Sequence, residues 1–127
     1  MLKQNFNVDG YWKVIVYWNV DYNFFDDVDF EMRKAGFKTA AIEETRKALQ
    51  SNDAKAVTCS TTTQHISIVI FNTHRSKADY ISSIVHEAEH VKQAILRAYN
   101  IEDMGEAPAY TIGYLVGKMY EAFKSFI

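Results

Sequence analysis

The sequence predicts an α+β fold in which a small sheet of about three strands, antiparallel or mixed, packs against helices. Runs rich in aromatic and β-branched residues at 11–20, 56–61 and 65–71 indicate the strands. Apolar residues recur at helical spacing in 37–49, in the segment that ends near Tyr99, and in 106–126. The expected order is therefore strand, helix, strand, strand, helix, helix, with no linker that would divide the chain.

The first half of the chain contains one segment that fits no single element. Asp26, Asp27 and Asp29 crowd the aromatic stretch 21–36. Such an acidic run is typical of a solvated turn or helix start, and it can also bind a cation. The following helix is expected to bury one face and to end at 51–53; the face comprises Ala41, Ile42, Thr45, Ala48 and Leu49.

Segments 56–61 and 65–71 are expected to form a hairpin around the turn 62–64. Alternation of Ile66, Ile68 and Ile70 with their neighbours gives the second strand a strongly apolar face. Cys59 is the only cysteine, so an intrachain disulfide and a cysteine-based zinc site are excluded. We expect it to be a small buried residue.

The last two helices have clear apolar stripes. Ser76 or Asp79 is expected to cap the first, and Pro108 occupies the first turn of the second, where a missing N–H costs little. Gly113 and Gly117 are expected to let the two helices approach closely, and the alternative is a helix face for self-association. The stripes comprise Ile81, Ile84, Ala88, Val91 and Ile95 in the first helix, and Ala109, Ile112, Val116, Met119, Phe123 and Phe126 in the second.

Size and composition place the chain in a broad class. Its 127 residues suit a single domain over 1–127, and 48% hydrophobic residues can fill a core. A net charge of −2 gives no electrostatic signature of nucleic-acid or anionic-membrane binding. No apolar run is long enough for a membrane span, and the N-terminus has no signal-peptide core. We therefore expect a soluble cytoplasmic protein.

The strongest functional signal is His86-Glu87-Ala88-Glu89-His90, an H-E-x-x-H motif in a predicted helix. Imidazoles four residues apart stack on one helical face and can chelate one Zn²⁺, while Glu87 can accept a proton from a metal-bound water. Helical phase turns His86 and His90 away from the apolar stripe, which indicates a surface or cleft wall. The alternative is a solvated face that carries two histidines by coincidence.

A hydrolytic zinc site normally has three protein ligands. Glu106 is the favoured third ligand, because it opens a helix that should fold back toward His90; alternatively, it only offsets the helix dipole. Glu102 and Asp103 are the other candidates. Tyr110, one turn after Glu106, is a candidate for stabilising an oxyanion, although a tyrosine there can also simply pack between helices. His65 and His74 are less favoured as ligands.

At these residues the chain resembles the zincin metallopeptidases, and among them the gluzincins. The resemblance covers 66–118. The chain looks most like the small, single-domain zincin-like proteins found in phages and mobile elements. The resemblance implies a zincin-like fold with the H-E-x-x-H on the penultimate helix. It also implies that 65–72 is an edge strand that pairs with an extended peptide substrate.

These observations predict a zinc-dependent metallopeptidase that acts on a peptide or protein substrate. Zinc would be bound by His86, His90 and Glu106, and Glu87 would be the general base. One alternative is a non-catalytic zinc-binding domain of the same fold that acts as an interaction or regulatory module. Another is a metal-free structural or adaptor domain. The oligomeric state is not predictable from these patterns.

Overall fold

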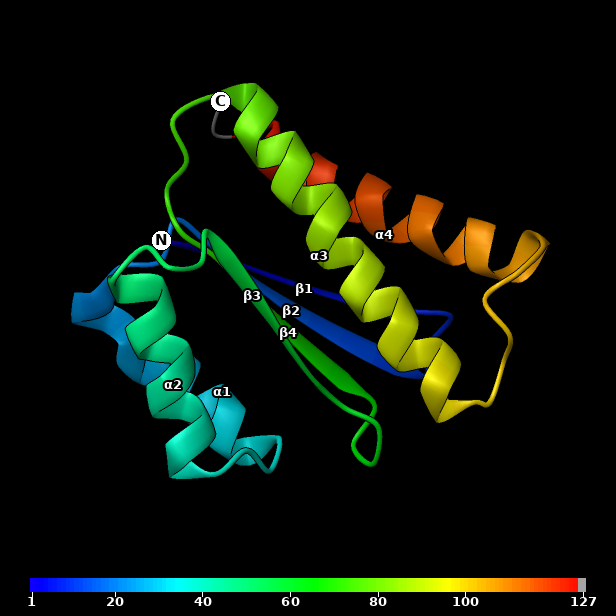
Figure 1. Cartoon of the computed structure of the whole chain (residues 1–127), viewed down its shortest axis with the longest axis horizontal. Coiled ribbons are helices and arrows are strands. Elements are labelled where there is room, and N and C mark those ends of the chain that lie inside the picture. Colours follow the sequence, from blue (N-terminus) through cyan, green and yellow to red (C-terminus); the bar gives the residue numbers. More distant parts are fainter. Residues whose placement is uncertain (126–127) are drawn as a thin grey trace.

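The computed structural model describes residues 1–125 as a four-stranded sheet with helices on both faces (Figure 1). This confirms the predicted α+β class. The elements are β1 (Leu2–Val8), β2 (Trp12–Trp18), the 3-10 helix η1 (Tyr22–Phe24), α1 (Phe25–Lys34), α2 (Thr39–Gln50), β3 (Ala56–Thr61), β4 (Ile66–Phe71), α3 (Lys77–Ala98) and α4 (Glu106–Phe123).

The sheet has the strand order β1-β2-β4-β3. It consists of two antiparallel hairpins, β1–β2 and β3–β4, joined by a parallel pairing of β2 with β4 that sets Val16 opposite Val69. The expected hairpin of 56–61 with 65–71 is confirmed. The expectation that 65–72 is an edge strand is wrong, because β4 pairs on both sides. Its residues from Ser67 to Phe71 are buried, as is usual for an interior strand, and the edge strand on this side of the sheet is β3.

Strand β1 lies in a region where no element was expected. It is an edge strand that alternates Leu2, Phe6 and Val8 with polar residues, and asparagine is depleted in strands generally. The hairpin turn contains Asp9 and Gly10, both with positive φ. An Asp-Gly pair between alternating residues is a recognised hairpin signal, and it is the feature by which β1 is detectable in the sequence.

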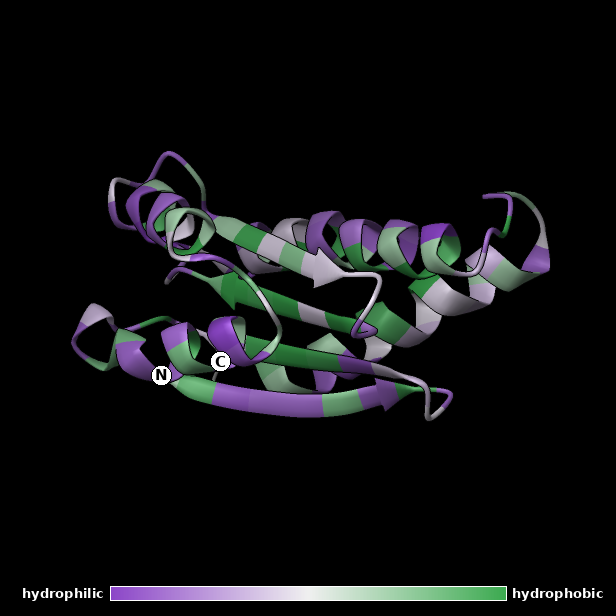
Figure 2. Ribbon diagram, turned by 90° about the horizontal axis from the view of Figure 1, so that it is seen from below, coloured by the Kyte–Doolittle hydropathy of each residue, from purple (hydrophilic) through white to green (hydrophobic). Residues whose placement is uncertain are grey.

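Each face of the sheet has its own core. Helices α1 and α2 cover one face, where Ile15, Tyr17, Ile68 and Ile70 point from the strands. Helices α3 and α4 cover the other face, where Val14, Val16, Trp18, Val69 and Phe71 are buried. Figure 2 shows the consequence along the sheet: β2 and β4 are strongly hydrophobic, whereas β1 carries hydrophilic residues at the edge.

The ambiguous segment 21–36 forms η1 and α1. Asp26 and Asp27 lie in the first turn of α1 and Arg33 and Lys34 in its last turn, which suits the helix dipole. Its acidic side chains are used separately: Asp27 accepts from Tyr17 and contacts Lys3, while Asp29 pairs with Arg33. They do not converge on a common point.

The stripe predicted for α3 is confirmed with one exception. Ile84, Ala88, Val91 and Ile95 are buried, but Ile81 is 40% exposed and Tyr80 is buried in its place. The stripe is wider than expected because α3 packs against both the sheet and α4. Of the two predicted caps, Ser76 is the N-cap, and its hydroxyl accepts from the Asp79 N–H.

The face of α4 is rotated from the predicted one. Met119 and Phe123 are buried and Ile112 and Val116 half-buried, but Ala109 is exposed. Pro108 and Leu115 are buried instead, and Phe126 lies outside the described residues. The expected close approach at Gly113 and Gly117 is wrong: both are exposed on the outward side of α4. A Cβ at either glycine would meet no atom of the described chain within 4 Å.

Candidate metal centre

The two motif histidines lie side by side on the exposed face of α3. Their Nε2 atoms are 3.2 Å apart, and the ring planes are inclined at 76°. Two nitrogens that each lie about 2.05 Å from one zinc ion at a tetrahedral angle are about 3.3 Å apart. The separation of the His86 and His90 nitrogens therefore matches the separation of two nitrogens bound to one zinc ion.

Glu87 points in a different direction, toward the sheet. The residue is only 4% exposed, and its Oε1 accepts a hydrogen bond of 2.9 Å from the Thr58 hydroxyl on β3. Its other oxygen, Oε2, lies 3.9 Å from His86 Nε2. One carboxylate oxygen is thus fixed by the edge strand, and the other lies beside the imidazole pair.

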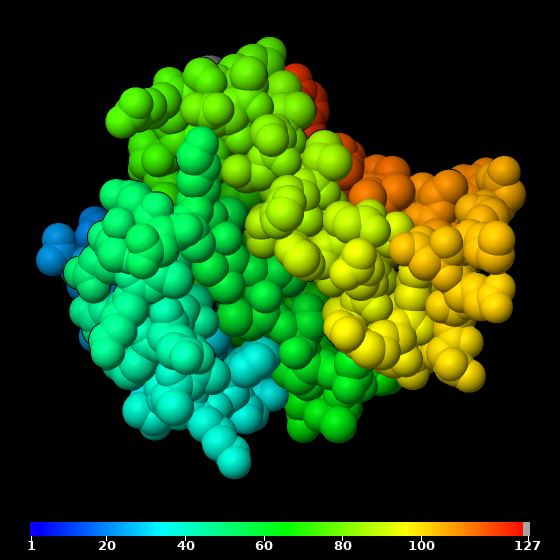
Figure 3. Space-filling model, viewed as in Figure 1, coloured from blue at the N-terminus to red at the C-terminus, as the bar shows by residue number. Residues whose placement is uncertain are grey.

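A hollow opens next to this carboxylate. Figure 3 shows strand β3 at the surface between α2 and α3. The hollow has a volume of about 350 Å³. A second hollow, of about 510 Å³, lies next to His74, and Lys55 lines both. The smaller hollow is lined by Ala54, Lys55, Ala56, Ser82, Ser83, His86 and Glu87. The motif therefore borders a recess large enough for part of a ligand.

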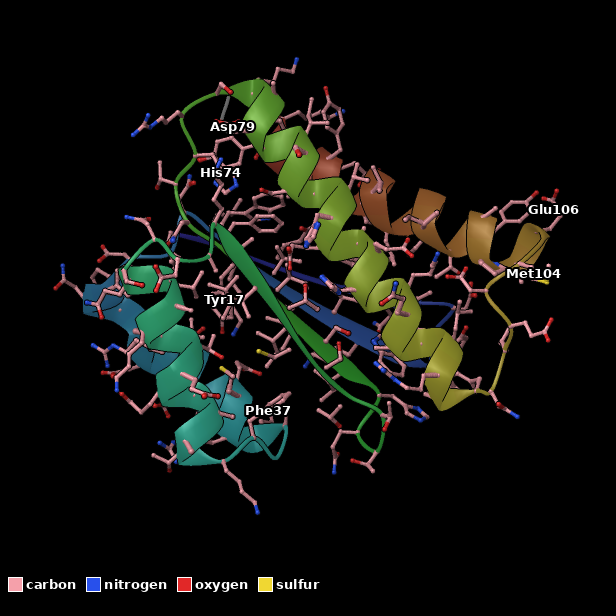
Figure 4. The ribbon with its side chains drawn as sticks, in the orientation of Figure 1. Tyr17, Phe37, His74, Asp79, Met104 and Glu106 are labelled. Atoms are coloured by element: carbon pink, nitrogen blue, oxygen red, sulfur yellow. The ribbon has the colours of Figure 1, made fainter. Side chains whose placement is uncertain are left out.

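The other two histidines have structural partners. The His74 ring donates from Nδ1 to the Asn72 carbonyl at 2.7 Å, and its Nε2 accepts from the Ser83 hydroxyl at 2.6 Å. The His74 ring also stacks on Tyr80. Figure 4 shows His74 at the point where the loop before α3 meets α3. His74 thus fastens this loop to α3. His65, in the β3–β4 turn, stacks on Trp12 and bonds Tyr99.

The structure does not bring Glu106 to the histidine pair. Glu106 is exposed at the first residue of α4, at the end of that helix that lies away from α3 and the sheet (Figure 4). Within residues 1–125, no three His, Cys, Asp or Glu side chains lie close enough together to hold a metal ion. The ligand role of Glu106 stays a prediction.

The alternative carboxylates are also accounted for. Asp103 accepts from the Lys92 ammonium at 3.0 Å, and Glu89 accepts from the same group at 2.8 Å. The hydrogen bond with Glu89, followed by that with Asp103, raises the pKa of Lys92. Glu102 is exposed. Asp103 therefore ties the α3–α4 connection to α3.

Tyr110 and Cys59 complete the set of predicted residues. Tyr110 is 76% exposed on the outward side of α4, and its catalytic role stays a prediction. Cys59 is half-buried on β3 beside the Thr45 hydroxyl, and burial raises the pKa of its thiol. Thr58, the neighbour that holds Glu87, was not among the residues expected from the sequence. The signal was only its place in a strand, and the sequence does not reveal which helix lies above that strand.

Comparisons with family models, with curated proteins and with solved structures gave no significant match. Across the part of the chain that the structure describes, no helix is both long and apolar enough to span a membrane. The assignment of the site therefore depends on the geometry of its residues.

Proposed function

We propose that the protein is a zinc-dependent hydrolase of peptide bonds, with His86 and His90 as zinc ligands and Glu87 as general base. The observation that carries the proposal is the 3.2 Å separation of the two Nε2 atoms beside an anchored carboxylate. An accidental pair of exposed histidines has no reason to adjoin a buried glutamate held from another element. Burying a carboxylate costs free energy unless hydrogen-bond donors satisfy it. A catalytic role for Glu87 would explain why the fold accepts that cost.

In the proposed reaction, metal binding, proton transfer and positioning fall to different residues. Zinc, when bound, would polarise a carbonyl and lower the pKa of a bound water to about 7. His86 and His90 would bind through neutral imidazole nitrogens. Oε2 of Glu87, next to the pair, would accept the proton and deliver it to the leaving amine, while Thr58 keeps the carboxylate in place through Oε1.

The edge strand supports a peptide as substrate. Among residues 1–125, β3 pairs only with β4, so the outer backbone groups of Ala56–Thr61 are open to another strand. Thr58 belongs to this strand and holds Glu87. An extended peptide added to β3 would therefore run past the proposed base.

A non-catalytic zinc-binding module is the second candidate, and the burial of Glu87 favours it. A carboxylate that is 4% exposed and already hydrogen-bonded has little room to exchange protons with water. A hydroxamate separates the two candidates. Displacement of a metal-bound water by the hydroxamate supports the hydrolase, whereas a zinc-loaded protein that does not bind it supports the module.

The decisive experiment measures zinc by elemental mass spectrometry and peptide hydrolysis on the same samples. We expect about one zinc per chain in the wild type and in Glu87→Gln, and none in His86→Ala. His65→Ala is the control, because it removes a histidine outside the pair. Hydrolysis should be lost in Glu87→Gln; unchanged hydrolysis in this variant would exclude Glu87 as the base.

The same assay tests Glu106. Loss of zinc from Glu106→Gln would support it as the third ligand, and unchanged zinc content would exclude it. Zinc-free wild-type protein, even after reconstitution, would leave only a structural or adaptor domain.

A further inference from the structure

Helix α4 turns one exposed face away from the rest of the chain. Leu115, Met119 and Phe123 are buried on its inner side. Figure 1 shows α4 at the margin of the fold, with α3 and the sheet on one side of it. Six exposed residues on the outward side are spaced alternately by four and three, as in the seam between two packed helices. They are Glu106, Tyr110, Gly113, Gly117, Tyr120 and Lys124, here called the α4 seam.

The α4 seam is self-complementary when reversed. Its order is acid, tyrosine, glycine, glycine, tyrosine, base, and its positions are symmetric about residue 115. An antiparallel second copy would set Glu106 against Lys124, Tyr110 against Tyr120, and the glycines against each other. A two-fold dimer interface requires this reciprocity. A parallel copy would instead oppose like charges at both ends.

The contacts in such a pair are physically favourable. Space beside both glycines is open for at least 4 Å from the position of a Cβ, so two helices can approach to the short end of the usual 8–10 Å. Tyr110 is 76% exposed and Tyr120 37% exposed, so pairing would bury aromatic surface. The seam extends for about 27 Å along the helix axis. Within the described chain, neither Glu106 nor Lys124 has an ion-pair partner.

We propose that the chain forms a two-fold homodimer through antiparallel packing of the α4 seams. We assign this face to a second copy of the chain because one helix carries both the acidic and the basic end. Its sequence of residue types therefore matches itself when the second helix runs in the opposite direction. None of the seam residues lines the hollow beside Glu87. The seam shares Glu106 and Tyr110 with the residues predicted for the zinc site, so the oligomeric state is measured without metal.

The oligomeric state tests the proposal. Sedimentation velocity in the presence of a chelator should give a mass of twice 14.6 kDa for the wild type and 14.6 kDa for Gly113→Arg. The variant should fold, because no atom of the described chain occupies that space and arginine is a better helix former than glycine. The chelator removes any effect of metal on Glu106. Gln93→Arg, which adds the same charge on exposed α3, should remain a dimer.

Charge reversal and cross-linking test the antiparallel order. Lys124→Glu should weaken the dimer about tenfold, and Glu106→Lys combined with Lys124→Glu should restore it. In a Cys59→Ala background, Tyr110→Cys with Tyr120→Cys should give a disulfide between copies, while each single variant should not. A wild type that is monomeric at every concentration, a dimeric Gly113→Arg, or cross-linking by the single variants would overturn the proposal.

Discussion

Thr58 on the edge strand β3 donates a 2.9 Å hydrogen bond to Glu87 of helix α3, 29 residues further along the chain. The bond crosses from the sheet to the helix and satisfies a carboxylate that is almost fully buried. It makes strand β3 part of the setting of the H-E-x-x-H motif. A side chain 29 residues away in the sequence therefore positions the proposed general base.

Replacement of Thr58 by valine should destabilise the fold and lower activity. Valine keeps the shape but leaves a buried oxygen of Glu87 without its donor, at a cost of about 1–3 kcal/mol. We expect this loss in urea unfolding, together with a fall in kcat and unchanged zinc content. Thr58→Ser keeps the hydroxyl and is the control. Equal stability of the valine variant and the wild type would show that the bond contributes nothing.

Zinc should stabilise the wild type against heat. A ligand that binds only the folded state at 100 times its Kd adds about 2.7 kcal/mol. The melting temperature should rise with added zinc and fall again with a chelator. His90→Ala lacks one nitrogen of the pair and should show no rise. A similar rise in both proteins would place the binding of zinc elsewhere.

Asp27 should contribute to stability at neutral but not at strongly acidic pH. The Tyr17 hydroxyl, and after it the Lys3 ammonium, lowers the pKa of Asp27 in the folded chain. A lowered pKa stabilises the fold above the unfolded value, about 3.9, and this contribution is lost as the pH falls through the folded value. The wild type should exceed Asp27→Asn in free energy of unfolding at pH 6, and this difference should shrink as the pH falls to 2. Urea unfolding at both pH values measures it. A difference that does not vary with pH would contradict this.

Lys92 should hold the connection between α3 and α4. Its ammonium bonds Glu89 and Asp103 while its stem is buried. Because the pKa of Lys92 is raised, its stabilisation is complete below the usual lysine value and is lost only as the pH rises through the folded value. Lys92→Met should increase hydrogen exchange of the amides in 99–105 at pH 7. Lys118→Met, at a half-buried position of α4, is the comparison and should leave that exchange unchanged.

The stacked pair of Trp18 and Phe71 should be central to stability. The rings lie parallel with centroids 4.4 Å apart, and both residues are fully buried beneath α3 and α4. Phe71→Ala should cost about 3–5 kcal/mol in urea unfolding. Phe30→Ala removes a ring that is 59% exposed and should cost far less. Comparable losses would mean that the described packing is not the main source of stability at Phe71.

Local patterns explain which parts of the fold were predictable. The β3–β4 hairpin and α3 have strong periodicity, and both occur close to the expected residues. Strand β1 lacks that signal because an edge strand tolerates asparagine and lysine. The interior position of β4 was missed because pairing of β2 with β4 joins distant segments.

The site was predictable to the same degree. Helical spacing alone brings His86 and His90 together, since both lie on α3. It also turns them away from the core, and both residues are exposed. The Thr58 contact and the position of Glu106 depend on how separate elements pack. The direction of a helix relative to a strand is a tertiary property, which short-range spacing does not contain.

The parallel seam between β2 and β4 has a consequence for how the chain folds. Each hairpin closes a short loop and can form early, but Val16 meets Val69 only after 53 residues are brought together. Closing so long a loop costs more entropy, so docking of the two hairpins is expected to limit the folding rate. Truncation of Val16 or Val69 should then slow folding.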